Sequence, residues 1–282
     1  MARIAHIRSV LLSAPYGDSE GNHEVIVHLP SGFRTTGLVE VTLENGVTGL
    51  GEGYIAVFAP KVFEALVDLI APNLIGKKLN ADSLKNLIRD TELIIGYWSY
   101  QGAARHALSA IEIALSDCLG KLCKVPVYRL LGARKRNLKV YASGGDSVDK
   151  ARMIDEFALV ERLGIKVFKV RARVDEYDKL KWCIEYGKKR GIRVAVDMTQ
   201  NLCIPGESVK SVMSFFQKLA NSSTELPVFV EESLGLDHLE DYPSLRNQLK
   251  SKVAGGEIVT HPNELIERIE SGYYDVVQPD AS

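Results

Sequence analysis

Short β-branched runs alternate with amphipathic stretches from residue 138 onward. The apolar runs occupy residues 138–142, 167–171, 194–198, 228–232, 252–257 and 274–278, and helical periodicity fills gaps such as 151–163, 177–189, 208–219 and 263–269. Repeated βα units of this kind predict a parallel sheet that closes as a barrel. Six runs are present, whereas a closed barrel of this type has about eight strands. We therefore expect a β/α barrel domain over residues 131–282 that is incomplete at its C-terminus.

Residues 1–130 follow a different order, in which strands precede helices. Apolar and polar residues alternate over 38–43, Asn45-Gly46 supplies a tight turn, and the strand pattern resumes at Val47, which predicts a β-hairpin. Apolar residues then recur at helical spacing over 60–70, 83–93 and 102–118. Strands followed by helices predict a separate α+β domain.

The charge balance excludes some classes of partner. Lys plus Arg total 35 against 36 Asp plus Glu, and the formal net charge is -1, so no global field attracts nucleic acid or an anionic membrane surface. The sequence also has no unbroken apolar run of about 18 residues that could span a bilayer. We expect a cytoplasmic protein whose partner is a small polar molecule.

Three acidic residues stand at the ends of three successive strands. Asp197 follows residues 193–196, Glu231 follows 228–230, and Glu257 follows 253–256. The strand ends on one face of a parallel barrel converge on its axis, and hard cations prefer oxygen ligands. Any one of these acids alone could be solvated or could cap the next helix. Together they predict one Mg²⁺ site.

Two segments of the N-terminal half have a distinctive spacing. Residues 41–52 read VTLENGVTGLGE, and residues 110–132 contain Ala110-Ile111-Glu112, Pro126-Val127 and Leu130-Leu131-Gly132. Both resemble the enolase superfamily, in its mandelate racemase and muconate-lactonizing branch. The resemblance implies an α+β capping domain that encloses the substrate and a TIM-type barrel with a modified first unit.

The resemblance also implies roles for residues of the predicted barrel. Asp197, Glu231 and Glu257 match the family's metal ligands, and Glu232 matches the second member of the usual acidic pair. Lys169 matches the first lysine of a Lys-x-Lys pair, but Arg171 occupies the position of the base. Arginine is a poor proton acceptor, yet its planar group binds a carboxylate or a developing oxyanion well.

Further residues are expected to touch or prepare the substrate. Thr199 takes the place of the asparagine in the family's Asp-x-Asn and can still bind a hydroxyl. Asp280, in Gln278-Pro279-Asp280, matches an aspartate that orients a histidine on the next strand, beyond Ser282. The polar stretch 16–36 has the character of a mobile loop, and the resemblance implies that this region closes over substrate. Arg34 within it and Tyr54 are expected to contact substrate.

These features predict an enzyme that removes water from a sugar-derived 2,3-dihydroxy acid. Loss of the proton beside the carboxylate would give an enediolate, stabilised by Mg²⁺, and departure of the 3-hydroxyl would leave a 2-keto-3-deoxy acid. Two alternatives stay open. The same site could run a racemisation, an epimerisation or a cycloisomerisation, or the chain could be an impaired barrel that only binds a ligand or assembles. We expect a small-molecule carboxylate as partner, and a homo-oligomer.

Overall fold

The protein, described here by a computed structural model for residues 2–15, 29, 32–203, 205–222 and 225–280, divides into two compact units. The first unit spans Met1–Arg136 and the second spans Asn137–Asp280. Each unit has its own hydrophobic core. No helix within the described ranges is both long enough and apolar enough to cross a membrane.

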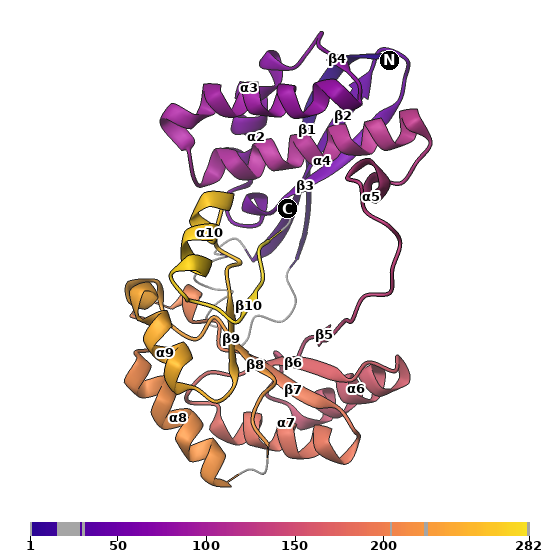
Figure 1. Cartoon of the computed structure of the whole chain (residues 1–282). Helices are drawn as coiled ribbons and strands as arrows, with labels where there is room; N and C mark the ends of the chain where they lie inside the picture. The colour runs from indigo at the N-terminus through magenta and orange to yellow at the C-terminus, as the bar shows by residue number, and fades with distance from the viewer. Residues whose placement is uncertain (1, 16–28, 30–31, 204, 223–224, 281–282) are drawn as a thin grey trace. The chain divides into compact units, whose positions relative to one another are not determined.

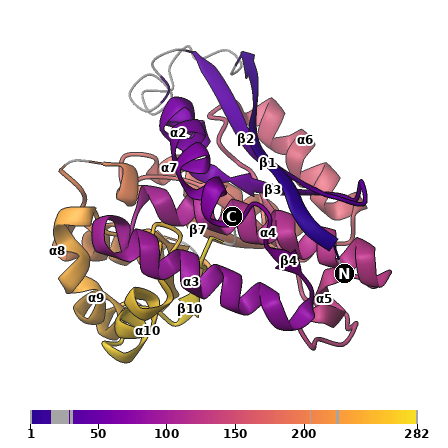
Figure 2. The ribbon, with the colours of Figure 1, turned by 90° about the horizontal axis from the view of Figure 1, so that it is seen from above.

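The first unit is an α+β module built on a four-stranded antiparallel sheet in the order β3-β2-β1-β4 (Figures 1 and 2). Its elements are β1 Ala2–Pro15, β2 Phe33–Leu43, β3 Thr48–Gly53, η1 Tyr54–Val57, α2 Pro60–Ile70, η2 Ala71–Asn73, β4 Lys78–Leu79, α3 Ala81–Ser99, α4 Ala103–Cys123 and α5 Val127–Leu130. The predicted order of strands before helices is confirmed.

The predicted hairpin connects β2 to β3. Thr42 pairs with Thr48, and Gly46 adopts φ +80° in the turn, where a side chain would be strained. The Gly46 N–H donates to the Leu43 carbonyl at 2.9 Å. The hairpin thus forms at the residues that the Asn-Gly pair indicated.

Helix α4 lies directly against β3 because two glycines of that strand have no side chain. A Cβ built on Gly49 would lie 2.1 Å from the Ala114 carbonyl oxygen, and one on Gly51 would lie 1.9 Å from the Ala110 carbonyl oxygen. Alternate residues of β2 point into the same core, where Val39 and Val41 pack among buried side chains such as Phe63.

The second unit is a curled parallel sheet with helices on its outer face, a partial β/α barrel (Figure 1). The strands follow the order β10-β9-β8-β7-β6-β5, and every neighbouring pair is parallel. The elements are β5 Ala142–Ser143, α6 Lys150–Arg162, β6 Val167–Arg171, α7 Tyr177–Lys189, β7 Arg193–Asp197, η3 Gln200–Leu202, α8 Val209–Ser222, β8 Phe229–Glu231, η4 Leu236–Asp241, α9 Tyr242–Gln248, β9 Lys252–Gly255, α10 Pro262–Glu270 and β10 Val276–Val277.

The two faces of this sheet are different in kind. On the outer face, Phe168 and Val170 of β6 join a large core with residues of α6, α7 and α8, including Phe157. On the inner face, Ala195, Phe229 and Ala254 form a small separate cluster. Since successive residues of a strand point to opposite faces, the inner face also receives Lys169, Arg171, Asp197 and Glu231.

Some elements differ from the sequence-based expectation. The run 138–142 yields only the two-residue strand β5, and Leu138 and Val140 stay largely exposed at the sheet edge. The long strand β1 and the short helix α9 were not predicted from the sequence. Strand β1 buries only Ile4 and Ile7 in the described structure, so it lacks the alternation that identifies a strand.

Candidate active site at the carboxyl ends of the strands

Three of the predicted site residues stand in one row across the sheet. The parallel register aligns Arg171 of β6 with Asp197 of β7, and Asp197 with Glu231 of β8. Each is the last residue of its strand. Arg171 and Asp197 are 26 positions apart in sequence, and Asp197 and Glu231 are 34 apart. The shared register explains why these residues nevertheless lie side by side at one edge of the sheet.

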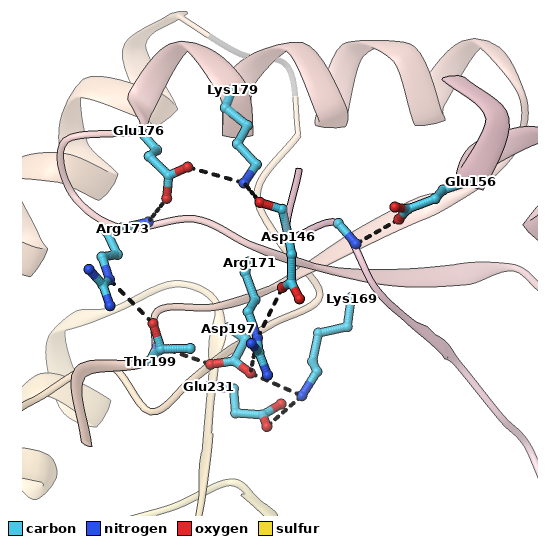
Figure 3. A network of polar contacts seen from close by, with 11 residues as sticks. Asp146, Glu156, Lys169, Arg171, Arg173, Glu176, Lys179, Asp197, Thr199 and Glu231 are labelled. Atoms are coloured by element: carbon cyan, nitrogen blue, oxygen red, sulfur yellow. Dashed lines mark hydrogen bonds and ion pairs between the residues drawn. The ribbon is translucent and has the colours of Figure 1, made fainter. Parts of the chain in front are cut away.

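Lys169 joins the two carboxylates of this row (Figure 3). Its Nζ lies 2.6 Å from Glu231 Oε1 and 3.2 Å from Asp197 Oδ2, and all three side chains are buried. Burial alone lowers the pKa of Lys169, but the charges of Asp197 and Glu231 outweigh it, so the pKa is raised. Lys169 therefore keeps its proton at neutral pH.

For Glu231, burial outweighs the effect of the opposite charge of Lys169 on the pKa. Burial, followed by the charge of Asp197, raises the pKa of Glu231 even though Lys169 acts to lower it. Its second oxygen, Oε2, is buried and has no hydrogen-bond partner among the described residues. A buried acceptor of this kind is suited to a ligand that supplies positive charge or a hydrogen.

Arg171 lies at the rim of the same row, with its side chain about half exposed. Its Nε is 3.3 Å from Asp146 Oδ1 and 3.9 Å from Asp197 Oδ2. The guanidinium is always protonated and presents a planar set of donors, which suits a carboxylate. Lys169 and Arg171 thus place two positive charges on the inner face, two residues apart on β6.

Glu257 does not join the other two predicted metal ligands. The described residues contain no group of three His, Cys, Asp or Glu side chains that could hold a metal ion. Glu257 is exposed, and its Oε1 accepts a hydrogen bond of 2.6 Å from Asn201 Nδ2. Like charges repel. Lys169 compensates the negative charges of Asp197 and Glu231, while the carboxylate of Glu257 is bound by Asn201.

The donor set nevertheless fits a hard divalent cation. Asp197 and Glu231 offer carboxylate oxygens, Glu231 Oε2 is buried without a partner in the described structure, and Glu257 lies two residues beyond the end of the neighbouring strand β9. Asp197, Glu231 and Glu257 are the residues that would hold Mg²⁺. The assignment of these three as ligands stays a prediction.

Glu232 is the most deeply buried acid of the site. It is 1% exposed, has φ +41°, and accepts a 2.9 Å hydrogen bond from the Gly256 N–H. Burial raises the pKa of Glu232 to about 7, and the charges of Glu257 and Asp197 add to that effect. Positive φ at a residue other than glycine is strained, which is common at functional sites.

Thr199 and Asp280 lie on loops that follow the strands. Thr199 is buried with φ 49°, its N–H donates to Asp197 Oδ1 at 3.0 Å, and its Oγ1 accepts from Arg173 Nε at 3.4 Å (Figure 3). Asp280 follows β10 and is exposed. Their proposed contacts, with substrate and with a histidine, stay predictions.

Arg34 and Tyr54 belong to the first unit. Arg34 is exposed on β2 opposite Ala14, and Tyr54 begins η1 with its ring 5.5 Å from that of Phe58. Most of the predicted loop 16–36 lies outside the described residues. The expected substrate contacts of Arg34 and Tyr54 stay predictions.

Sequence reasoning missed three polar groups of the second unit. Asn201 binds Glu257, and Gln278 Nε2 donates to Tyr141 Oη at 2.9 Å. The ring of Tyr141 lies 5.8 Å from Lys169 Nζ. Asn201 follows Asp197 by four residues, a spacing that could have indicated a helical turn beside the strand end.

Comparisons with known proteins agree with this fold. Residues 31–132 match the family described as the mandelate racemase / muconate lactonizing enzyme N-terminal domain, and residues 152–282 match the enolase C-terminal domain-like family. The chain is 24% identical over 255 residues to the arabinonate dehydratase of Saccharolobus solfataricus and 29% identical over 256 residues to the D-galactonate dehydratase of Variovorax paradoxus. Each alignment covers 86% of this chain and 64% of the relative.

Solved structures share the fold. The 3,6-anhydro-D-galactonate cycloisomerase of Zobellia galactanivorans superposes with a TM-score of 0.81 at 23% identity, over 99% of this chain and 72% of that one. A mandelate racemase/muconate lactonizing protein of Paracoccus denitrificans, complexed with magnesium, gives a TM-score of 0.76 at 23% identity. The superposition covers 100% of this chain and 72% of that one. With matches to both of its domains, the chain belongs to the mandelate racemase / muconate lactonizing enzyme family of the enolase superfamily.

Proposed function

We propose that this chain takes part in the Mg²⁺-dependent dehydration of a sugar-derived 2,3-dihydroxy acid to a 2-keto-3-deoxy acid through an enediolate. The observation that carries the proposal is the buried group of Lys169, Asp197 and Glu231, with Arg171 in register beside it. Curated relatives named as arabinonate and D-galactonate dehydratases support this substrate class. The chain spans 64% of the length of these relatives.

Lys169 and Arg171 bind and orient the acid in this proposal. Both are protonated at neutral pH, Lys169 because its carboxylate neighbours raise its pKa and Arg171 by its nature. Two fixed cations on the inner face attract a carboxylate and favour the negative charge that develops when the neighbouring proton leaves. A bound Mg²⁺ would supply further positive charge to the same oxygens.

The proton acceptor must be another group. A base accepts a proton only if it is neutral or negative at the working pH, which excludes Lys169 and Arg171 in this state. We infer that Asp280 orients a histidine for this purpose, as the family resemblance implies. A His-Asp pair would also protonate the departing hydroxyl.

The proposal is tested by incubating a protein that carries both this chain and the inferred histidine with D-galactonate or D-arabinonate, in Mg²⁺ or in EDTA, and measuring 2-keto acid formation. We expect formation with Mg²⁺ and none with EDTA. The Arg171→Met variant should lose about tenfold or more of kcat/KM. Arg193→Met, at the opposite end of β7, is the matched control and should keep the wild-type rate.

Other outcomes separate the competing functions. Deuterium entering the α-carbon from solvent without 2-keto acid would indicate racemisation or epimerisation. Mg²⁺-dependent binding of sugar acid in calorimetry without turnover would indicate a binding protein. A complete lack of reaction with a broad panel of sugar acids would refute the dehydratase proposal for this chain.

A further inference from the structure

Asn201 has a hydrogen-bonding arrangement that the proposed function does not yet use. It lies in η3, one turn beyond Asp197, and is 5% exposed. Its Nδ2 is 2.6 Å from Glu257 Oε1. A carboxylate only accepts hydrogen bonds, so the nitrogen of the carboxamide must face Glu257 and the oxygen must face away from it.

The carboxamide oxygen has no donor. Asn201 Oδ1 is buried, and no hydrogen-bond partner for it is found within the described parts of the chain. Leaving a buried acceptor unsatisfied is costly, and such groups in native proteins call for an explanation. A hydroxyl group of a bound molecule would satisfy this oxygen.

Gln200, the residue before Asn201, is held by three hydrogen bonds. The Gln200 N–H donates to the Glu232 carbonyl at 2.9 Å, and Gln200 Nε2 donates to the Met198 carbonyl at 3.0 Å. The Glu207 N–H donates to Gln200 Oε1 at 3.1 Å. Because neighbouring residues are held in this way, the carboxamide is oriented before any ligand arrives.

We propose that Asn201 links Glu257 to the bound sugar acid. Its Nδ2 orients Glu257, and its Oδ1 accepts a hydrogen bond from a substrate hydroxyl. This inference rests on the proposed function, since it assumes that Glu257 is a metal ligand and that the substrate is a polyhydroxylated acid.

The test compares the wild-type chain with Asn201→Leu, which keeps the branched shape of the side chain and removes both polar atoms. Asn247→Leu, at an exposed position of α9, is the matched control. Calorimetry with MgCl₂ alone should give an affinity about tenfold weaker for Asn201→Leu, because outer residues that orient ligands have effects of this size. D-Galactonate added to the Mg²⁺-loaded protein should bind Asn201→Leu about tenfold more weakly than it binds wild type.

Thermal unfolding in EDTA separates this role from a structural one. Asn201→Leu removes the unsatisfied oxygen but also the hydrogen bond from Nδ2 to Glu257, so Tm should rise or fall by less than about 5 °C. A fall of about 5 °C or more would mean that the amide supports the fold, and would overturn the inference.

The remaining outcomes distinguish the two proposals. If wild type binds Mg²⁺ and D-galactonate and Asn201→Leu binds both equally well, the inference fails and the proposed function stands. If wild type binds neither, the proposed function fails and the inference fails with it. A loss of affinity for Mg²⁺ and D-galactonate that occurs in Asn201→Leu and not in Asn247→Leu supports the inference.

Discussion

Tyr141 and Gln278 are joined by a hydrogen bond although they flank opposite edges of the six-stranded sheet. Gln278 Nε2 donates to Tyr141 Oη at 2.9 Å. Tyr141 precedes β5 and Gln278 follows β10, the two edge strands. At about 4.8 Å per strand, a flat sheet of this size would hold its edges about 24 Å apart. The contact therefore depends on the curl of the sheet.

Removal of the Tyr141 hydroxyl should weaken this connection. Tyr141→Phe keeps the ring, which lies 5.5 Å from that of Phe229, but deprives Gln278 of its acceptor. We expect the free energy of unfolding to fall by about 1 kcal/mol, measured by urea denaturation. Tyr97→Phe removes a hydroxyl from a fully exposed residue and should change it by less than about 0.5 kcal/mol. Equal effects of the two substitutions would contradict a role for the contact in the curled sheet.

Lys169 should be essential for stability as well as for binding. Lys169→Met leaves the buried carboxylates of Asp197 and Glu231 without their shared cation, and removing one partner from such a group costs about 3 to 5 kcal/mol. The loss should shrink as pH falls, because protonation neutralises the two acids. Lys210→Met, at an exposed position in α8, serves as control. A Lys169→Met chain as stable as wild type at neutral pH would refute the ion pairs.

Asp275 should make stability depend on pH in the acid range. Burial raises its pKa, but hydrogen bonds from the Val253 N–H and the Arg246 guanidinium outweigh burial, so the pKa is lowered from its ordinary value of 3.8. A lowered folded-state pKa stabilises the protein above the unfolded pKa, and the contribution is lost as pH falls through the folded value.

The Asp275→Asn variant tests this linkage. It should lose about 1 to 2 kcal/mol of unfolding free energy at neutral pH. The difference from wild type should narrow as pH falls below about 4. Asp155→Asn, at an exposed position on α6, is the matched control. A gap for Asp275→Asn that stays constant with pH would argue against the assigned hydrogen bonds.

Gly51 should tolerate no side chain. Its Cβ would lie 1.9 Å from the Ala110 carbonyl oxygen, so Gly51→Ala must separate β3 from α4 at a cost of about 3 kcal/mol. Gly96 of α3 has open space around a Cβ in the described structure, and Gly96→Ala should add up to about 1 kcal/mol through helix propensity. Chemical denaturation measures both. A stable Gly51→Ala chain would show that the close approach is wrong.

The sequence by itself determined the elements and the strand ends. The Asn45-Gly46 turn and the apolar periodicity of β6 and α7 are local signals, because backbone preference and the alternation of buried residues act over a few positions. The same local reasoning placed Asp197 and Glu231 at strand ends. It missed β1, whose described residues bury only two side chains, and α9, which is one short helix.

Only the tertiary structure decided which side chains meet. The register of β6, β7 and β8 aligns Arg171, Asp197 and Glu231, while Lys169 reaches the two acids from one pleat below. The curl of the sheet brings Tyr141 within hydrogen-bond distance of Gln278, and the turn after β7 places Asn201 where it donates a hydrogen bond to Glu257. These contacts depend on strand order, twist and burial, which act between segments distant in sequence and leave no local pattern.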